Sequence, residues 1–173
     1  MQRMILTRDA ILEEIQQGNL VISDFNEENV GPASVDLTLD DEIRVFTNYE
    51  SIVPIQEDVD YKKATRLINI RETGYILKPQ ELILGITKET ILLPPYLAGW
   101  LQSRSRFARL GLMSHITAPF IMPGSNNKQV LEIFNAGNCN LQLVSGIKIC
   151  QMIFNRCEGK ASYDGKFQHQ NLT

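Results

Sequence analysis

The stretch Pro32-Ala-Ser-Val-Asp-Leu-Thr-Leu39 decides the fold class, because apolar and polar residues alternate along it. Val35, Leu37 and Leu39 would lie on one face of an extended strand, since successive side chains of a strand point to opposite faces. The pair Asp40-Asp41 follows and is interpreted as a turn before the alternation resumes. The period of two predicts that the chain is β-structured from this point onward.

Short strand-like runs recur over the rest of the chain, with Gly and Pro between them. We expect strands at 75–77, 82–87, 91–93, 99–101, 113–117, 130–135, 141–144 and 147–154. The polar segment 47–73 is expected to form a long loop or an ornamented hairpin. Thr7 is a candidate N-cap for a helix that ends near Gly18. The pattern predicts a mainly β domain, a sandwich or a barrel, with a few short helices including one at the N-terminus.

Composition limits the class of protein. The 173 residues are 43% hydrophobic and carry a net charge of −3, which fits one domain over residues 1–173 and lacks the basic excess of a nonspecific nucleic-acid binder. No apolar run approaches the roughly 20 residues of a membrane span, and the N-terminus has no signal-peptide core. Cys139, Cys150 and Cys157 form no C-x-x-C pair and are expected to be reduced thiols. We therefore expect a cytoplasmic protein with no nucleic-acid or membrane partner.

Glu132 is the first candidate for chemistry, because it lies within the apolar run Val130-Leu-Glu-Ile-Phe-Asn135. On a strand it would share one face with Val130 and Phe134, and both faces are apolar. Burial disfavours the charged form of a carboxylate and is predicted to raise the pKa of Glu132 toward neutrality. Glu132 is thus a candidate general acid and base. The alternatives are a structural Glu paired with an arginine, or a partly exposed strand.

The segment Ser103-Arg-Ser-Arg-Phe-Ala-Arg-Leu-Gly111 is the second candidate. It would form one or two helical turns closed by the glycine, with Ser105 and Arg109 on one face. Free N–H groups at the start of this turn, together with Arg104 and Arg106, would bind a phosphate. The alternative is a solvated basic turn.

The polar tail is the third candidate, because it carries Tyr163, Lys166 and Gln170. It is either a lid that folds over a phosphate or a frayed terminus. Zinc catalysis is not indicated, since neither His115 nor His169 has the Glu and Cys neighbours of a zinc deaminase. His115 is interpreted as a packed loop histidine.

Several separated motifs resemble the dCTP deaminases of the dUTPase-like superfamily. The likeness is strongest within 99–118, which contains Arg104-Ser105, Ala108-Arg-Leu-Gly-Leu112 and His115-Ile-Thr-Ala118, and extends to 32–39, 130–135 and the tail 163–170. It covers roughly residues 4–170. The resemblance implies a distorted jelly-roll-like β-barrel that forms homotrimers with its sites at the subunit interfaces.

The resemblance also implies an activity, the hydrolytic deamination of dCTP to dUTP and ammonia, which supplies dUTP for thymidylate synthesis. Glu132 would take a proton from the attacking water and deliver protons to N3 and to the leaving amine. Ser105 and the backbone near Ala118 would hold the water, and Arg109 would support the base and the developing charge. Glu132, Ser105 and Arg109 are thus the implied catalytic residues.

The implied ligand is a cytosine nucleotide triphosphate that carries its own Mg²⁺, with no zinc and no metal ligand from a protein side chain. The tail, about residues 160–173, would close over the site. The implied substrate-binding residues are Arg104, Ser105, Arg106, Arg109, Thr117, Ala118, Val130, Leu131, Glu132, Tyr163, Lys166 and Gln170.

The chain departs from the family pattern Ile-Asp-Pro-Gly at Ile121-Met-Pro-Gly124. In related enzymes that Asp meets the sugar 3′-hydroxyl, and in dUTPase-type members it also orients the water that cleaves the triphosphate. Met122 neither accepts a strong hydrogen bond nor acts as a base, so hydrolysis of dUTP to dUMP is predicted to be absent or weak. Arg106 and the segment Ser125-Asn-Asn127 also differ and suggest a rebuilt sugar pocket. Besides an ordinary dCTP deaminase, a deaminase of another cytosine nucleotide and a non-catalytic nucleotide-binding regulatory protein stay open.

Overall fold

The computed structural model describes residues 4–47 and 52–173, so that residues 1–3 and 48–51 of the predicted domain and loop lie outside the described part. The strands are β1 (Val21–Ile22), β2 (Val35–Phe46), β3 (Thr65–Asn69), β4 (Tyr75–Leu77), β5 (Leu82–Leu92), β6 (Leu97–Ser103), β7 (Leu112–Met113), β8 (Phe120–Ile121), β9 (Asn126–Asn135), β10 (Leu141–Leu143) and β11 (Lys148–Arg156). The helices are α1 (Arg8–Gln16) and α2 (Ser105–Ala108), with short 3₁₀ turns η1 (Glu27–Asn29) and η2 (Tyr61–Ala64).

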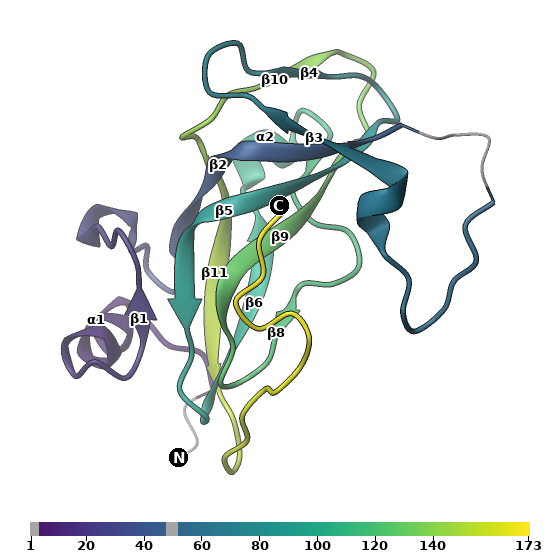
Figure 1. Ribbon diagram of the computed structural model, residues 1–173. Coiled ribbons are helices and arrows are strands. Elements are labelled where there is room, and N and C mark those ends of the chain that lie inside the picture. Colours follow the sequence, from purple (N-terminus) through teal and green to yellow (C-terminus); the bar gives the residue numbers. More distant parts are fainter. Residues whose placement is uncertain (1–3, 48–51) are drawn as a thin grey trace.

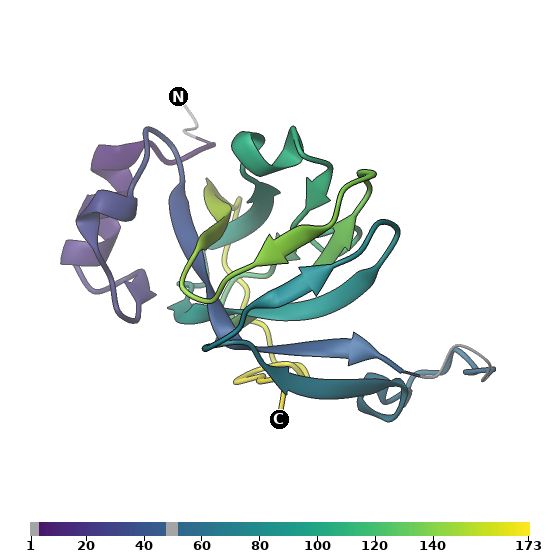
Figure 2. The same cartoon turned by 90° about the horizontal axis from the view of Figure 1, so that it is seen from above.

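Within these residues, the main sheet has nine strands, in the order β7-β9-β5-β2-β11-β6-β8 with β1 on β5 and β3 on β2. A two-stranded sheet of β10 and β4 lies beyond one end. The long strands curl around a common interior, while α1 and β1 lie to one side (Figures 1 and 2). The predicted mainly β domain with few helices is confirmed.

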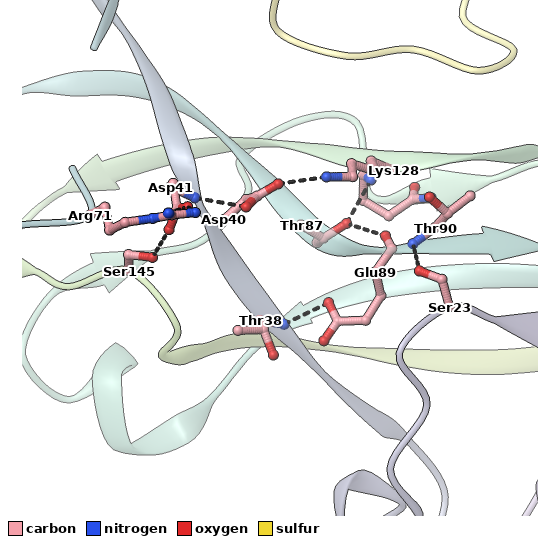
Figure 3. A network of polar contacts seen from close by, with 11 residues as sticks. Ser23, Thr38, Asp40, Asp41, Arg71, Thr87, Glu89, Thr90, Lys128 and Ser145 are labelled. Atoms are coloured by element: carbon pink, nitrogen blue, oxygen red, sulfur yellow. Dashed lines mark hydrogen bonds and ion pairs between the residues drawn. The ribbon is translucent and has the colours of Figure 1, made fainter. Parts of the chain in front are cut away.

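β2 is the strand that joins the two halves of the curled sheet. Its first residues pair with β11, and its later residues pair with β3 and β5 after a register shift. The predicted turn at Asp40-Asp41 is wrong, because both residues continue the strand. Asp40 pairs with Lys128 at 2.6 Å, and Asp41 accepts hydrogen bonds from Arg71 and Ser145 (Figure 3). These partners satisfy two carboxylates that would otherwise favour a solvated turn.

β5 combines two of the predicted runs, 82–87 and 91–93, into one strand with an irregularity in its register against β9. The Thr87 hydroxyl donates to the Glu89 carbonyl at 2.9 Å and accepts from the Gln129 N–H at 2.8 Å. Figure 3 shows how these contacts cluster where β2 and β5 cross. The polar groups at this irregularity therefore have hydrogen-bond partners inside the sheet.

The N-terminal helix follows the sequence prediction. α1 has Thr7 at its N-cap, although the Thr7 side chain makes no capping hydrogen bond, and Gly18 after its end has φ +72°. Ile11 is fully buried against the sheet, where Phe154 of β11 is also fully buried. Among the described residues, no helix has the length and apolar character needed to cross a membrane. All three cysteines are free thiols.

Candidate active site

A cavity of about 650 Å³ lies between β9, the segment 116–122 and the C-terminal tail. This volume is in the range of sites that hold a nucleotide-sized ligand. The lining is mostly apolar, and Glu132 contributes a carboxylate to it. None of the described residues that line the cavity is a lysine, an arginine or a histidine. The cavity therefore offers an acid/base group and apolar walls, but no cation of its own.

Glu132 is held by the loop that precedes β8. Its Oε2 accepts hydrogen bonds from the N–H groups of Ile116 at 2.9 Å and Thr117 at 2.6 Å, and its Oε1 accepts from the Thr117 hydroxyl at 3.0 Å. The predicted strand 113–117 is wrong beyond Met113, since the chain turns there and points these N–H groups at the carboxylate. The geometry fixes the orientation of the carboxylate before any ligand binds.

The predicted rise in the pKa of Glu132 is wrong. Desolvation does raise the pKa, but the N–H and hydroxyl groups of Thr117 and the N–H of Ile116 stabilise the anion, and together they lower the pKa of Glu132 below its ordinary value of 4.5. The residue shares its half-buried face with Val130 and Phe134, while Leu131 and Ile133 are fully buried. Glu132 is therefore an ionised carboxylate at neutral pH, which suits a group that accepts a proton.

His115 lies beside this site and is neutral. Burial lowers its pKa from the ordinary 6.5, and the Glu132 carboxylate only partly opposes that effect. Its Nδ1 is buried and has no hydrogen-bond partner among the described residues. A neutral imidazole at this place adds no charge to the cavity.

The arginine turn, residues 104–109, lies outside the cavity. α2 forms as predicted, with Ser105, Arg106 and Arg109 exposed to solvent. Arg104 is committed elsewhere: its guanidinium pairs with Asp36 at 2.9 Å and donates to the Lys148 carbonyl at 3.0 Å. Within one described chain, the structure does not bring these residues together with Glu132.

The tail is docked rather than frayed. It follows β8 and β9 (Figure 1), and the Tyr163 N–H donates to the Pro123 carbonyl at 2.8 Å. Tyr163 and Gln170 line the cavity as expected, together with Phe167. Lys166 does not line it, and the Lys166 Nζ instead donates to the Glu57 carbonyl at 3.4 Å. The tail thus supplies part of the cavity wall, whereas Lys166, its predicted phosphate-binding cation, lies outside the cavity lining.

Comparison with known proteins identifies the family. A family model described as dCTP deaminase-like matches residues 5–157. The chain belongs to this family. A Corynebacterium kroppenstedtii protein named "dCTP deaminase, dUMP-forming" is 41% identical over 152 residues, which cover 86% of this chain and 80% of the relative. A Rhodococcus opacus protein of the same name is 39% identical over 163 residues, covering 92% of this chain and 85% of the relative.

The fold of the family is found in a solved structure as well. The crystal structure of 2′-deoxycytidine 5′-triphosphate deaminase from Agrobacterium tumefaciens matches this chain with a TM-score of 0.71 at 20% identity. The match covers 91% of this chain and 49% of that chain, so this chain spans about half the length of the longer protein. The predicted membership of the dCTP deaminase-like family and its β fold are confirmed.

The remaining residues implied by the family divide between the cavity and the core. Thr117, Ala118 and Val130 line the cavity, as does the divergent Met122, whereas Leu131 is fully buried in the core. Met122 is half exposed at the cavity wall. The thioether therefore stands where the family pattern places a carboxylate.

Sequence reasoning missed several residues of the cavity wall. Phe46 and Tyr61 come from β2 and η2, far from the motifs. Asn127 and Gln129 are buried amides that also line the cavity, and the Gln129 side chain donates to the Asn127 side chain at 2.8 Å. Two polar residues at successive inward positions of β9 were the available signal, since buried amides need specific partners.

The described residues contain no group of three or more His, Cys, Asp or Glu side chains arranged to hold a metal ion.

Proposed function

We propose that this chain catalyses the hydrolytic deamination of dCTP. The observation that carries the proposal is the ionised Glu132 carboxylate, fixed in the wall of a nucleotide-sized cavity in a member of the dCTP deaminase-like family. The names of the curated relatives point to the same substrate. The chain acts as one domain, with the tail of about residues 160–173 closed over the ligand.

In this reaction a water molecule adds to C4 of cytosine, and ammonia leaves. Glu132 takes a proton from the water as its oxygen bonds to C4 and gives this proton to N3. It then takes the remaining proton from the C4 hydroxyl as the C4=O bond forms and gives it to the amine, which leaves as ammonia when the C4–N bond breaks. The lowered pKa keeps Glu132 ionised at neutral pH, the state in which it can accept a proton, and it also makes the carboxylate a weaker base than an ordinary glutamate. Thr117 and Ala118 line the cavity beside Glu132, where the attacking water would be held.

The second half of the site comes from another copy of the chain, in a homotrimer. A triphosphate carries several negative charges, yet the described cavity lining contains no cation. Ser105, Arg106 and Arg109 are exposed on α2 and outside the cavity of their own chain. Contributed by a neighbour, Ser105 would hold the water, and Arg109 would support the base and the developing charge. Arg106 would bind the phosphates, while Arg104 fixes the turn through Asp36.

The triphosphate carries Mg²⁺, as expected for hard phosphate oxygens. Bound to the phosphates, Mg²⁺ would neutralise part of their charge. The protein's contacts to the phosphates would come from Tyr163 and Gln170 on the tail and from Arg106 of the neighbouring copy.

The product of the proposed reaction is dUTP, which other enzymes would convert for thymidylate synthesis. The curated relatives are named dUMP-forming, but cleavage of the triphosphate needs a group that orients a second water. Met122 at the cavity wall offers no such group. This chain is therefore expected to stop after deamination.

The test is to incubate the protein with Mg²⁺ and, in separate reactions, with dCTP, CTP, dCMP and dUTP, while ammonia and nucleotides are measured. We expect ammonia and dUTP from dCTP, with little dUMP from dCTP or from dUTP. The Met122→Asp variant should increase the share of dUMP. Abundant dUMP from the unmodified chain would contradict the role assigned to Met122. If only CTP or only dCMP released ammonia, that nucleotide would replace dCTP as the proposed substrate.

A nucleotide-binding regulatory protein is the second candidate. It is favoured by the fact that the carboxylate oxygens of Glu132 already accept hydrogen bonds from Ile116 and Thr117 of the same chain. If dCTP binds but neither the unmodified chain nor a Glu132→Gln variant releases ammonia, the regulatory function replaces the enzymatic one.

A further inference from the structure

Arg44 is a buried cation without a carboxylate partner. Its residue is only 8% exposed, and no described acidic group lies within ion-pair distance of its guanidinium. Its donors are instead used on neutral oxygens: Nε donates to the Thr65 hydroxyl at 2.8 Å, and Nη1 donates to the Leu172 carbonyl at 2.7 Å. Buried charges in proteins are usually paired, so this arrangement is costly and requires a reason.

One partner of Arg44 is the end of the tail. The Leu172 side chain is fully buried, and its carbonyl is the oxygen that Arg44 Nη1 contacts. Earlier in the tail, the His169 N–H donates to the Asn126 carbonyl at 3.0 Å, and the Gln170 side chain donates to the Lys128 carbonyl at 2.9 Å. The tail is thus attached along β9 and again at Arg44, with the cavity-lining residues between the start of the tail and that last attachment.

The other partner of Arg44 is the η2 turn. The Thr65 hydroxyl that accepts from Arg44 donates in turn to the Tyr61 carbonyl at 2.9 Å, and the guanidinium lies 5.9 Å from the centre of the Tyr61 ring. Tyr61 and Phe167 both line the cavity. Arg44 therefore joins two separate parts of the cavity wall, the η2 turn and the tail, through contacts made by one side chain.

We propose that Arg44 is a positioning residue that latches the tail over the cavity and aligns it with the Tyr61 wall. The role rests on the proposed function, because the latched tail carries Tyr163 and Gln170 against the nucleotide. Hydrogen bonds to a main-chain carbonyl can form and break without separating an ion pair, which suits a segment that must release its ligand in each cycle. Arg44 itself touches no reacting atom.

The first measurement is hydrogen exchange of the protein without nucleotide, comparing peptides from the tail with peptides from β11. In Arg44→Gln, the amides of the tail, including that of His169, should exchange about tenfold faster than in the unmodified protein. The amides of β11 should exchange at an unchanged rate, because only local opening becomes easier. Arg44→Lys should lie between the two, since lysine keeps the charge but reaches fewer acceptors. Arg66→Gln, an exposed arginine on β3, is the matched control and should resemble the unmodified protein.

The second measurement is steady-state kinetics with dCTP. Arg44→Gln should raise KM about tenfold and change kcat less than about twofold, because it weakens closure over the ligand and leaves Glu132 in place. Equal tail exchange in all four proteins would overturn the latch, as would faster exchange in both tail and β11. Faster tail exchange with an unchanged KM would overturn its link to the ligand. If the unmodified protein has no deaminase activity, the proposed function fails, while the exchange experiment still decides whether Arg44 holds the tail.

Discussion

The cavity beside β9 and the arginine turn of α2 are unequal parts of the same predicted site. In the cavity, Glu132 is oriented by the loop at 116–117, and the docked tail closes part of the wall. Ser105 and Arg106 of α2, and Arg109 directly after it, are exposed and do not line this cavity within the described part of their own chain. In the proposed function, Glu132 comes from one chain, and Ser105, Arg106 and Arg109 come from a second copy. Substitutions can therefore test these two groups of residues separately.

The largest effect should come from removing the proton acceptor. Glu132→Gln keeps the size of the side chain but cannot accept a proton from water, so kcat should fall roughly 10²–10⁴-fold. Thermal unfolding and dCTP binding should change little, and Glu72→Gln, at an exposed position, provides the control. Activity within a few-fold of the unmodified protein would remove Glu132 from the mechanism.

Mixing experiments test whether the two halves come from different chains. Arg109→Ala alone should lower kcat/KM by about 10²-fold, because it removes a charge-assisted contact to the transition state. Glu132→Gln and Arg109→Ala subunits should then complement each other after joint refolding. Random assembly would leave about one quarter of the interface sites intact, and activity should recover in that proportion. If the mixture is no more active than the separate variants, both halves belong to one chain.

A smaller effect is expected in the Thr117→Val variant, in which the pH dependence of activity should change. The Thr117 hydroxyl helps to keep the Glu132 pKa below 4.5, so its loss lets the pKa rise. Because the base must be ionised, activity is present above the Glu132 pKa and is lost as the pH falls through it. The acid limb of the pH–rate profile should therefore move to higher pH in Thr117→Val, with kcat at neutral pH falling only about twofold to tenfold. Thr117→Ser keeps the hydroxyl and should preserve the profile; a shift in both variants would point to packing instead.

The local patterns of the sequence were sufficient for much of the fold. Alternation over 35–39 and the apolar run 130–135 predicted strands that the structure contains, and Gly18 and Gly111 end the segments that they were expected to end. Asp40-Asp41 failed as a turn because its partners, Lys128 and Arg71, lie far away in the sequence. In the sequence alone, two adjacent aspartates in a strand resemble a turn, because their distant partners are not known.

By itself, the sequence determined the β class, the family motifs, Glu132 as the candidate base and Met122 as the departure from the family pattern. Only the tertiary structure decided that the Glu132 pKa is lowered, that the arginine turn lies outside the cavity, and that Arg44 donates a hydrogen bond to the tail. The physical reason is the range of the interactions. The alternation of residues along a strand indicates which of them are buried. The N–H groups that stabilise Glu132, in contrast, lie 16 and 15 positions away along the chain, and Leu172 lies 128 positions from Arg44. Such partners meet only when the chain has folded.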